Sequence, residues 1–374
     1  MVRYFDEINL LRAFAILAMI SIHVSAYFKE MSAINILATV YMSIQTFSQF
    51  AVPLFVGISG FVLYNRYPGK IDLKKFYKKR LLSIVPPYIV FSTFYLGVTT
   101  IVAIALSKPV NLQVSHILYQ YLTGSCFYFL WFIILIIQFY LLYPAIVWTF
   151  NYCDLRGRSF ELLVVAFIIG VFYFVYAPRV VTIIPLLEVA PKIVATKFLG
   201  YLFYFMLGMT VRSRYDELPL KPVSRTSFGC VWIFLLCCTI IGIVDNANSF
   251  LKFNTAQILP VIGNYGIWLA ATIVSPVYYV IIFALCFFIS RHIVSHKTSG
   301  ILMLEKIGHN SFGIYLVHAF MLYVIVMVFP RFGFDWNTWL FYPCAFCLTL
   351  ILSIYSVEII QRFPHSEYII GSTR

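Results

Sequence analysis

The chain is built from apolar runs of about 20 residues, and most of its charge lies in the short segments between them. A helix needs about 20 apolar residues to cross the roughly 30 Å hydrocarbon core of a bilayer. Of the 374 residues, 62% are hydrophobic and 11% are charged, whereas soluble domains are about 45–50% apolar and about 25% charged. Because backbone groups in lipid must be hydrogen-bonded within the protein, these runs predict membrane-spanning helices.

We predict ten spans, at residues 13–28, 34–64, 84–106, 127–149, 160–177, 196–211, 227–244, 270–290, 309–329 and 337–361. The second is long enough to be tilted, kinked or partly interfacial, and the eighth is the least clearly bounded. The semi-polar stretch 248–269 fits an outer-face or re-entrant segment. The first run lacks a small-residue cleavage site, so we interpret it as an uncleaved helix and not a signal peptide. We expect one polytopic membrane domain over residues 1–374.

The distribution of positive charge predicts the orientation of the chain. With both termini in the cytoplasm, the inner segments carry 20 of the 27 Lys and Arg residues and the outer segments carry 7. This bias follows the positive-inside rule. It predicts an all-α integral membrane protein of about ten transmembrane helices with cytoplasmic N- and C-termini. It also explains the net charge of +13 without a nucleic-acid partner.

The eight cysteines lie mostly inside apolar runs. Cys344 and Cys347 have C-x-x-C spacing, but no second pair or nearby histidine completes a set of metal ligands. We therefore expect packing cysteines, no disulfide framework and no metal site.

Two polar residues interrupt the first run, Arg12 near its start and His23 in its second half. At 100° per residue, eleven residues come within about 20° of three full turns, so both side chains share one helix face about 16 Å apart. In one interpretation, Arg12 extends to the inner headgroups and His23 makes an interhelical hydrogen bond. In the other, both line a polar tunnel, where Arg12 holds an anion and His23 transfers protons, because an unperturbed imidazole has a pKa near 6.5.

Further stretches of the chain carry recognisable patterns in a fixed order. The Arg12-x10-His23 pair is followed by FVGISGFVL (55–63), FYKKRLLSIVPPY (76–88), FLWFIILIIQFYLLYP (129–144), YLFYFMLGM (201–209) and IGHNSFGIYLVHAF (307–320). Together they resemble membrane-bound acyltransferase family 3, whose members move acyl groups, commonly acetyl, onto cell-surface and secreted glycans. A looser similarity connects the chain to the branch implicated in exopolysaccharide and intercellular-adhesin export or succinyl transfer.

Some positions depart from the family pattern. Asn9 stands where the family often has Asp, Ser83 where its basic loop has a second Arg, and Ile136 and Ile137 where many members have acidic residues. These departures concern the acyl donor more than the fold. Ser59 and Gly60 lie in no G-x-S-x-G elbow, so we expect Gly60 to allow close helix packing.

The resemblance implies a role for several basic and polar residues. His23 is the expected catalytic base, and Arg12 would hold the donor or polarise its thioester. Arg80 matches the family's arginine, so Arg80, with Lys79 and Tyr88, is the candidate site for coenzyme A. The remaining lysines of the inner loop 66–80 are expected to set topology and bind anionic lipid.

Aromatic residues of the fourth span and a late histidine are the candidate sugar-binding groups. Tyr128, Trp131 and Tyr140 would stack on or hydrogen-bond a sugar, although aromatic residues at helix ends also serve as interfacial anchors. His318 is a further substrate-binding candidate, and a buried structural histidine is the alternative interpretation.

These patterns predict a multi-pass O-acyltransferase of the cell membrane. Its donor would be acetyl-CoA or another acyl-CoA, with no tightly bound cofactor, and its acceptor a glycan or polysaccharide. Its other partners would be membrane lipids, and the sequence leaves open whether it forms a homodimer. The alternative functions are an exporter or flippase for polysaccharide or lipid-linked sugar, and a structural membrane subunit without chemistry of its own.

Overall fold

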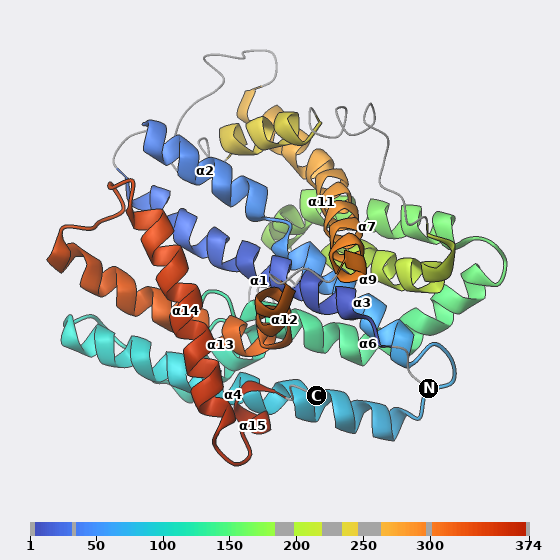
Figure 1. Cartoon of the computed structure of the whole chain (residues 1–374), viewed down its shortest axis with the longest axis horizontal. Coiled ribbons are helices and arrows are strands. Elements are labelled where there is room, and N and C mark those ends of the chain that lie inside the picture. Colours follow the sequence, from blue (N-terminus) through green and yellow to red (C-terminus); the bar gives the residue numbers. More distant parts are fainter. Residues whose placement is uncertain are drawn as a thin grey trace. The chain divides into compact units, whose positions relative to one another are not determined.

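A computed structural model describes residues 4–31, 35–183, 198–218, 234–245, 263–296 and 301–371, and within this part helices are the only regular elements (Figure 1). The α-helices are α1 Asp6–Ser25, α2 Ile36–Ser48, α3 Ala51–Arg66, α4 Leu73–Ala105, α5 Val114–Thr123, α6 Trp131–Asp154, α7 Ser159–Ile183, α9 Phe198–Ser213, the helix Phe234–Asp245, α11 Gly263–His296, α12 Ile301–His309, α13 Ser311–Val328, α14 Phe341–Gln361 and α15 Glu367–Ile370. The short 3-10 helices are η1 Ala26–Glu30, η3 Tyr215–Glu217 and η5 Phe329–Phe332.

The predicted all-α membrane architecture is confirmed. Eight described helical segments are long and apolar enough to cross a bilayer: 6–30, 36–66, 73–105, 131–154, 159–176, 268–295, 311–332 and 341–361. Two other predicted spans are less complete in the described part. The span 196–211 corresponds to the 16-residue helix α9. For the span 227–244, the structure describes the helix Phe234–Asp245, and residues 227–233 lie outside the described residues. Of the semi-polar stretch 248–269, residues 263–269 belong to α11, and the rest lies outside the described residues.

The second span, for which a tilt, a kink or a partly interfacial position was open, is broken in the structure. Helix α2 ends at Ser48, a turn follows at Gln49 and Phe50, and α3 begins at Ala51. Pro53 lies in the first turn of α3, where its missing N–H interrupts no helical hydrogen bond.

Helix α4 begins earlier than predicted. We expected the basic segment 65–83 to be a loop, but the helix starts at Leu73. The Asp72 side chain accepts a hydrogen bond from the Lys75 backbone N–H at 3.1 Å and so caps the first turn. This bond, together with the Lys75 ammonium, holds the pKa of the Asp72 carboxyl below its usual value.

The early start of α4 changes the context of the basic motif. The predicted span, which begins at residue 84, leaves Arg80 before the helix, but in the structure Arg80 lies in the third turn of α4. Pro86, Pro87 and Tyr88 do not begin the helix either, since they lie in its interior. Helices that span membranes tolerate proline where neighbouring groups satisfy the freed carbonyls.

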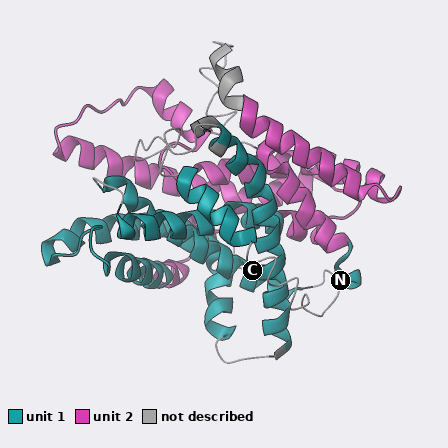
Figure 2. Ribbon diagram, turned by 90° about the horizontal axis from the view of Figure 1, so that it is seen from above, with its two compact units in different colours: residues 1, 3–58, 214–356 teal, residues 2, 59–213, 357–374 magenta. Residues whose placement is uncertain are grey.

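The described residues divide into two compact units, which Figure 2 colours separately. Unit 1 comprises residues 3–58 and 214–356, and unit 2 comprises residues 59–213 and 357–374, so the division falls inside α3 and α14. In unit 1, α1 packs against α2, α11, α12 and α13. Its apolar side chains Leu10, Ile16 and Ile20 are fully buried. Helix α1 is therefore the central element of unit 1.

In unit 2, α6 has the corresponding central place, because it packs against α4, α5, α7 and α9. Helix α3 approaches α9 closely at a glycine. A Cβ built on Gly60 would lie 2.0 Å from the backbone oxygen of Phe205, far inside van der Waals contact. The structure thus confirms that Gly60 permits close helix packing.

We expect Gly60→Ala to lower the melting temperature of the purified protein, because the added methyl group meets a backbone atom that cannot move alone. Overpacking of this kind destabilises by about 1–3 kcal/mol. The matched control is Gly97→Ala in α4, where a Cβ would meet nothing within 4 Å and alanine favours the helix. Thermal unfolding in detergent measures both variants. Equal melting temperatures for the two would contradict the close contact.

Candidate functional site

The two polar residues of the first span lie on one uninterrupted helix. Helix α1 runs from Asp6 to Ser25 without a break, so the helical geometry that places Arg12 and His23 on one face applies. The side chains of both residues are partly buried.

Within unit 1, the structure brings His23 against a second histidine. The rings of His23 and His318 are stacked, with centroids 5.2 Å apart and planes inclined by 30°. His318 belongs to α13 and is fully buried. The two histidines were predicted to have separate roles, and nothing in their spacing indicated that they would meet. Only the packing of α13 on α1 reveals the pair.

The protonation of His318 is set by its neighbour on the same helix. Its Nδ1 donates a hydrogen bond to the backbone oxygen of Tyr315 at 2.7 Å. A carbonyl oxygen can only accept, so in the neutral ring the proton is on Nδ1 and Nε2 keeps the lone pair. This hydrogen bond also restrains the ring plane against which His23 stacks.

At the other end of α1, Arg12 is held by a neutral partner. Its Nη1 donates to Oδ1 of Asn9 at 3.4 Å, and Nδ2 of Asn9 donates to the hydroxyl of Tyr4 at 2.7 Å. An amide orients the guanidinium through this contact without adding a negative charge.

The segment α12–α13 contacts α1 at two levels. A Cβ on Gly308 would lie 1.8 Å from the backbone oxygen of Asn9, so only glycine permits this approach. Ten residues later, His318 meets His23. The motif IGHNSFGIYLVHAF therefore fixes α13 along α1 from the level of Asn9 to the level of His23.

A second polar cluster lies in unit 2 and surrounds Arg80. Its guanidinium carbon lies 5.1 Å from the ring centroid of Tyr67 and 5.9 Å from that of Tyr140. The Tyr143 hydroxyl donates to the backbone oxygen of Tyr67 at 2.9 Å, and Phe76 stacks on Tyr143 at 5.5 Å. We call these five residues the Arg80 cluster.

Other contacts hold the turn that carries Tyr67. Asn151 of α6 donates from Nδ2 to the backbone oxygen of Pro68 at 2.7 Å and accepts from the hydroxyl of Tyr64 at 3.1 Å. Arg80 itself has a buried Nε that has no hydrogen-bond partner among the described residues. The cluster thus presents a cation that is positioned by aromatic rings.

The remaining predicted residues are placed as follows. Lys79 is exposed next to Arg80. The hydroxyl of Tyr88, a predicted coenzyme A contact, donates to the backbone oxygen of Tyr121 in α5. Of the predicted sugar contacts, only Tyr140 joins the Arg80 cluster.

Two of the predicted sugar contacts lie at the start of the fourth span. Tyr128 was predicted to lie on that helix, but it lies in the turn before α6, and it is 53% exposed. Trp131 is the first residue of α6, and its ring centroid lies 6.3 Å from that of Tyr201 in α9.

The described residues include no group of three or more His, Cys, Asp or Glu side chains arranged to hold a metal ion. The described cysteines, among them Cys344 and Cys347, carry free thiols. We therefore assign no metal ligand within this part of the chain.

Comparison with known families agrees with this arrangement. A family model described as an acyltransferase domain matches residues 5–358. No curated protein and no solved structure matched the chain. The matched range runs from the start of α1 into α14 and contains both the histidine pair and the Arg80 cluster. Because it covers nearly the whole chain, the protein belongs to acyltransferase family 3 and is a multi-pass membrane acyltransferase.

Proposed function

We propose that the protein is an O-acyltransferase of the cell membrane that moves an acetyl group from cytoplasmic acetyl-CoA to a hydroxyl of a cell-surface or secreted glycan. The observation that carries this proposal is the His23–His318 pair, because it places an oriented imidazole inside the helical part of a family member whose chemistry requires a base.

The proposed step uses His23 as the general base. The acceptor oxygen attacks the thioester carbonyl, and His23 takes the hydroxyl proton. As the new C–O bond forms, the C–S bond breaks, and the coenzyme A sulfur receives the proton from His23. His318 acts as a positioning residue, since its ring is fixed by Tyr315 and limits the orientations open to His23. Two imidazolium ions at this separation would repel each other, so the pair suits a single transferred proton.

The positive groups account for the donor. Coenzyme A is anionic, and Arg is suited to phosphate because its planar guanidinium offers several N–H groups in a fixed geometry. The ring contacts of the Arg80 cluster support Arg80 as the phosphate-binding residue, with exposed Lys79 beside it. Arg12 would polarise the thioester or hold the pantetheine arm, and the Asn9 amide helps to orient its guanidinium.

We expect His23→Ala to lower acyl transfer by about 10²–10⁴-fold, the usual contribution of a general base. His309→Ala, which changes an exposed histidine of α12, should keep full activity. Membranes containing equal amounts of each variant are incubated with radiolabelled acetyl-CoA, and label in glycan is counted. Full transfer by His23→Ala would contradict the proposed function. Uptake of glycan into vesicles without acyl turnover would instead identify an exporter.

We expect Arg80→Lys to raise the KM for acetyl-CoA by about 10-fold or more, because lysine keeps the charge but loses a charge-assisted hydrogen bond and the ring contacts. The kcat should change little. Lys74→Gln removes an exposed charge from the same helix and serves as the control for a general electrostatic effect. Steady-state kinetics over a range of donor concentrations separates them. Parallel changes of KM in both variants would assign the effect to overall charge and not to the Arg80 cluster.

A further inference from the structure

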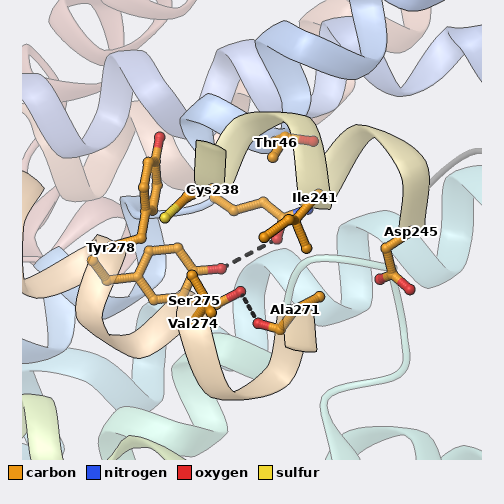
Figure 3. Close-up of a pocket in the computed structure, with 11 residues that line it drawn as sticks. Thr46, Cys238, Ile241, Asp245, Ala271, Val274, Ser275 and Tyr278 are labelled. Atoms are coloured by element: carbon orange, nitrogen blue, oxygen red, sulfur yellow. Dashed lines mark hydrogen bonds between the residues drawn. The ribbon is translucent and has the colours of Figure 1, made fainter. Parts of the chain in front are cut away.

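Unit 1 contains a cavity that includes none of the site residues discussed above. Its volume is about 60 Å³, and it is lined by side chains from α2, the helix Phe234–Asp245 and α11 (Figure 3). A buried water needs about 10–15 Å³ of such space, so the cavity has room for about four waters or for one small polar group of a larger ligand.

Two internal hydrogen bonds determine what the wall offers to a ligand. The hydroxyl of Tyr279 donates to Oε1 of Gln49 at 3.2 Å, so the amide nitrogen of Gln49 is the donor end. The hydroxyl of Ser275 donates to the backbone oxygen of Ala271 at 2.5 Å, so its proton is not offered to a ligand. Figure 3 shows Ser275 with this bond, and Asp245 on the helix that forms another side of the cavity.

The two proposed substrates, anionic acetyl-CoA and a glycan, differ in charge, and the charge of the cavity favours one of them. Asp245 supplies a carboxylate, and the lining contains no Lys, Arg or His among the described residues. A carboxylate without a cation beside it repels phosphates in a low-dielectric site, so the wall does not suit coenzyme A. A neutral ligand with hydroxyl groups fits better, because its O–H groups can donate to Asp245 and its oxygens can accept from Gln49.

Aromatic rings complete the lining. Tyr278 and Tyr279 both belong to it, and the Tyr278 hydroxyl donates to the backbone oxygen of Phe47 at 3.0 Å, which holds that ring between α11 and α2. Sites for small molecules commonly combine apolar or aromatic walls with a few fixed polar groups. In the orientation predicted from the distribution of charge, Asp245 is toward the outer face, where a glycan would arrive.

We propose that this cavity is an acceptor subsite that binds a hydroxyl-bearing group, such as the hydroxymethyl group of a neutral sugar, with Asp245 as acceptor and Gln49 as donor. The proposal rests on the proposed transfer to a glycan. This part of unit 1 would recognise the acceptor, and its ligand would be a neutral polyol.

A native thiol allows the cavity to be tested directly. Cys238 lines it, whereas its neighbour Cys237 is exposed on the helix surface. The full-length protein in nanodiscs is treated with methyl methanethiosulfonate, and mass spectrometry measures the label at each cysteine. We expect methyl glucoside or methyl N-acetylglucosaminide to slow labelling of Cys238 but not of Cys237, and glucose 6-phosphate to have less effect. Absence of sugar protection, absence of any label at Cys238, or protection by sodium ions alone would overturn the proposal.

A kinetic test uses substitutions that preserve shape. Asp245→Asn should raise the KM for the glycan acceptor by about 10-fold or more, the value of a hydrogen bond to a charged group, and leave the KM for acetyl-CoA unchanged. Ser275→Ala should raise the acceptor KM less. Asp335→Asn is the matched control, because asparagine can still accept the backbone N–H of Asn337 that Asp335 binds at 2.9 Å. An unchanged acceptor KM in folded Asp245→Asn would contradict the subsite.

The two proposals fail in different ways. If the wild-type protein transfers acyl groups but sugars do not protect Cys238, the acceptor subsite is wrong and the proposed function stands. If sugars protect Cys238 but no acyl group is ever transferred, the cavity binds polyols and the proposed acyltransfer to glycan is wrong.

Discussion

The close packing of α12 and α13 on α1 is the interaction on which the histidine site depends. Gly308 brings one backbone against the other at Asn9, and this contact sets the position along α1 at which the ring of His318 meets His23. In an apolar environment a polar side chain is unfavourable unless another group of the protein satisfies it. The polar residues of α1 therefore need a neighbouring helix at a defined position, and Gly308 gives that helix the room to approach.

The two charged clusters suit chemically different ligands. In unit 2, the rings of Tyr67 and Tyr140 lie beside the Arg80 guanidinium, and a planar guanidinium suits phosphate. In unit 1, the cavity beside Asp245 carries the opposite charge and offers hydrogen bonds that suit neutral hydroxyls. The proposed reaction needs an anionic donor and a polyol acceptor to bind without exchange, and opposite electrostatics at the two proposed sites would provide that selectivity.

The membrane helices could be predicted from the sequence wherever a long apolar run decided them, since lipid allows few alternatives to a helix. Boundaries were predicted less well. The start of α4 depends on Asp72, whose side chain caps the helix and extends it through the basic segment that includes Arg80. The start of α6 at Trp131 likewise leaves Tyr128 in a turn. Hydropathy does not register a capping hydrogen bond, so the start of α4 was misplaced.

The sequence by itself determined that the chain is a helical membrane protein of an acyltransferase family, that Arg12 and His23 share a helix face, and that Gly60 permits close packing. These results follow from the length of the apolar runs, the geometry of a single helix and the short motifs. Only the tertiary structure decided that His318 stacks on His23, that Tyr67 and Tyr140 flank Arg80, and that Gln49, Asp245 and Ser275 meet around one cavity. These contacts join residues far apart in the chain, and helix–helix packing, which no local pattern encodes, brings them together.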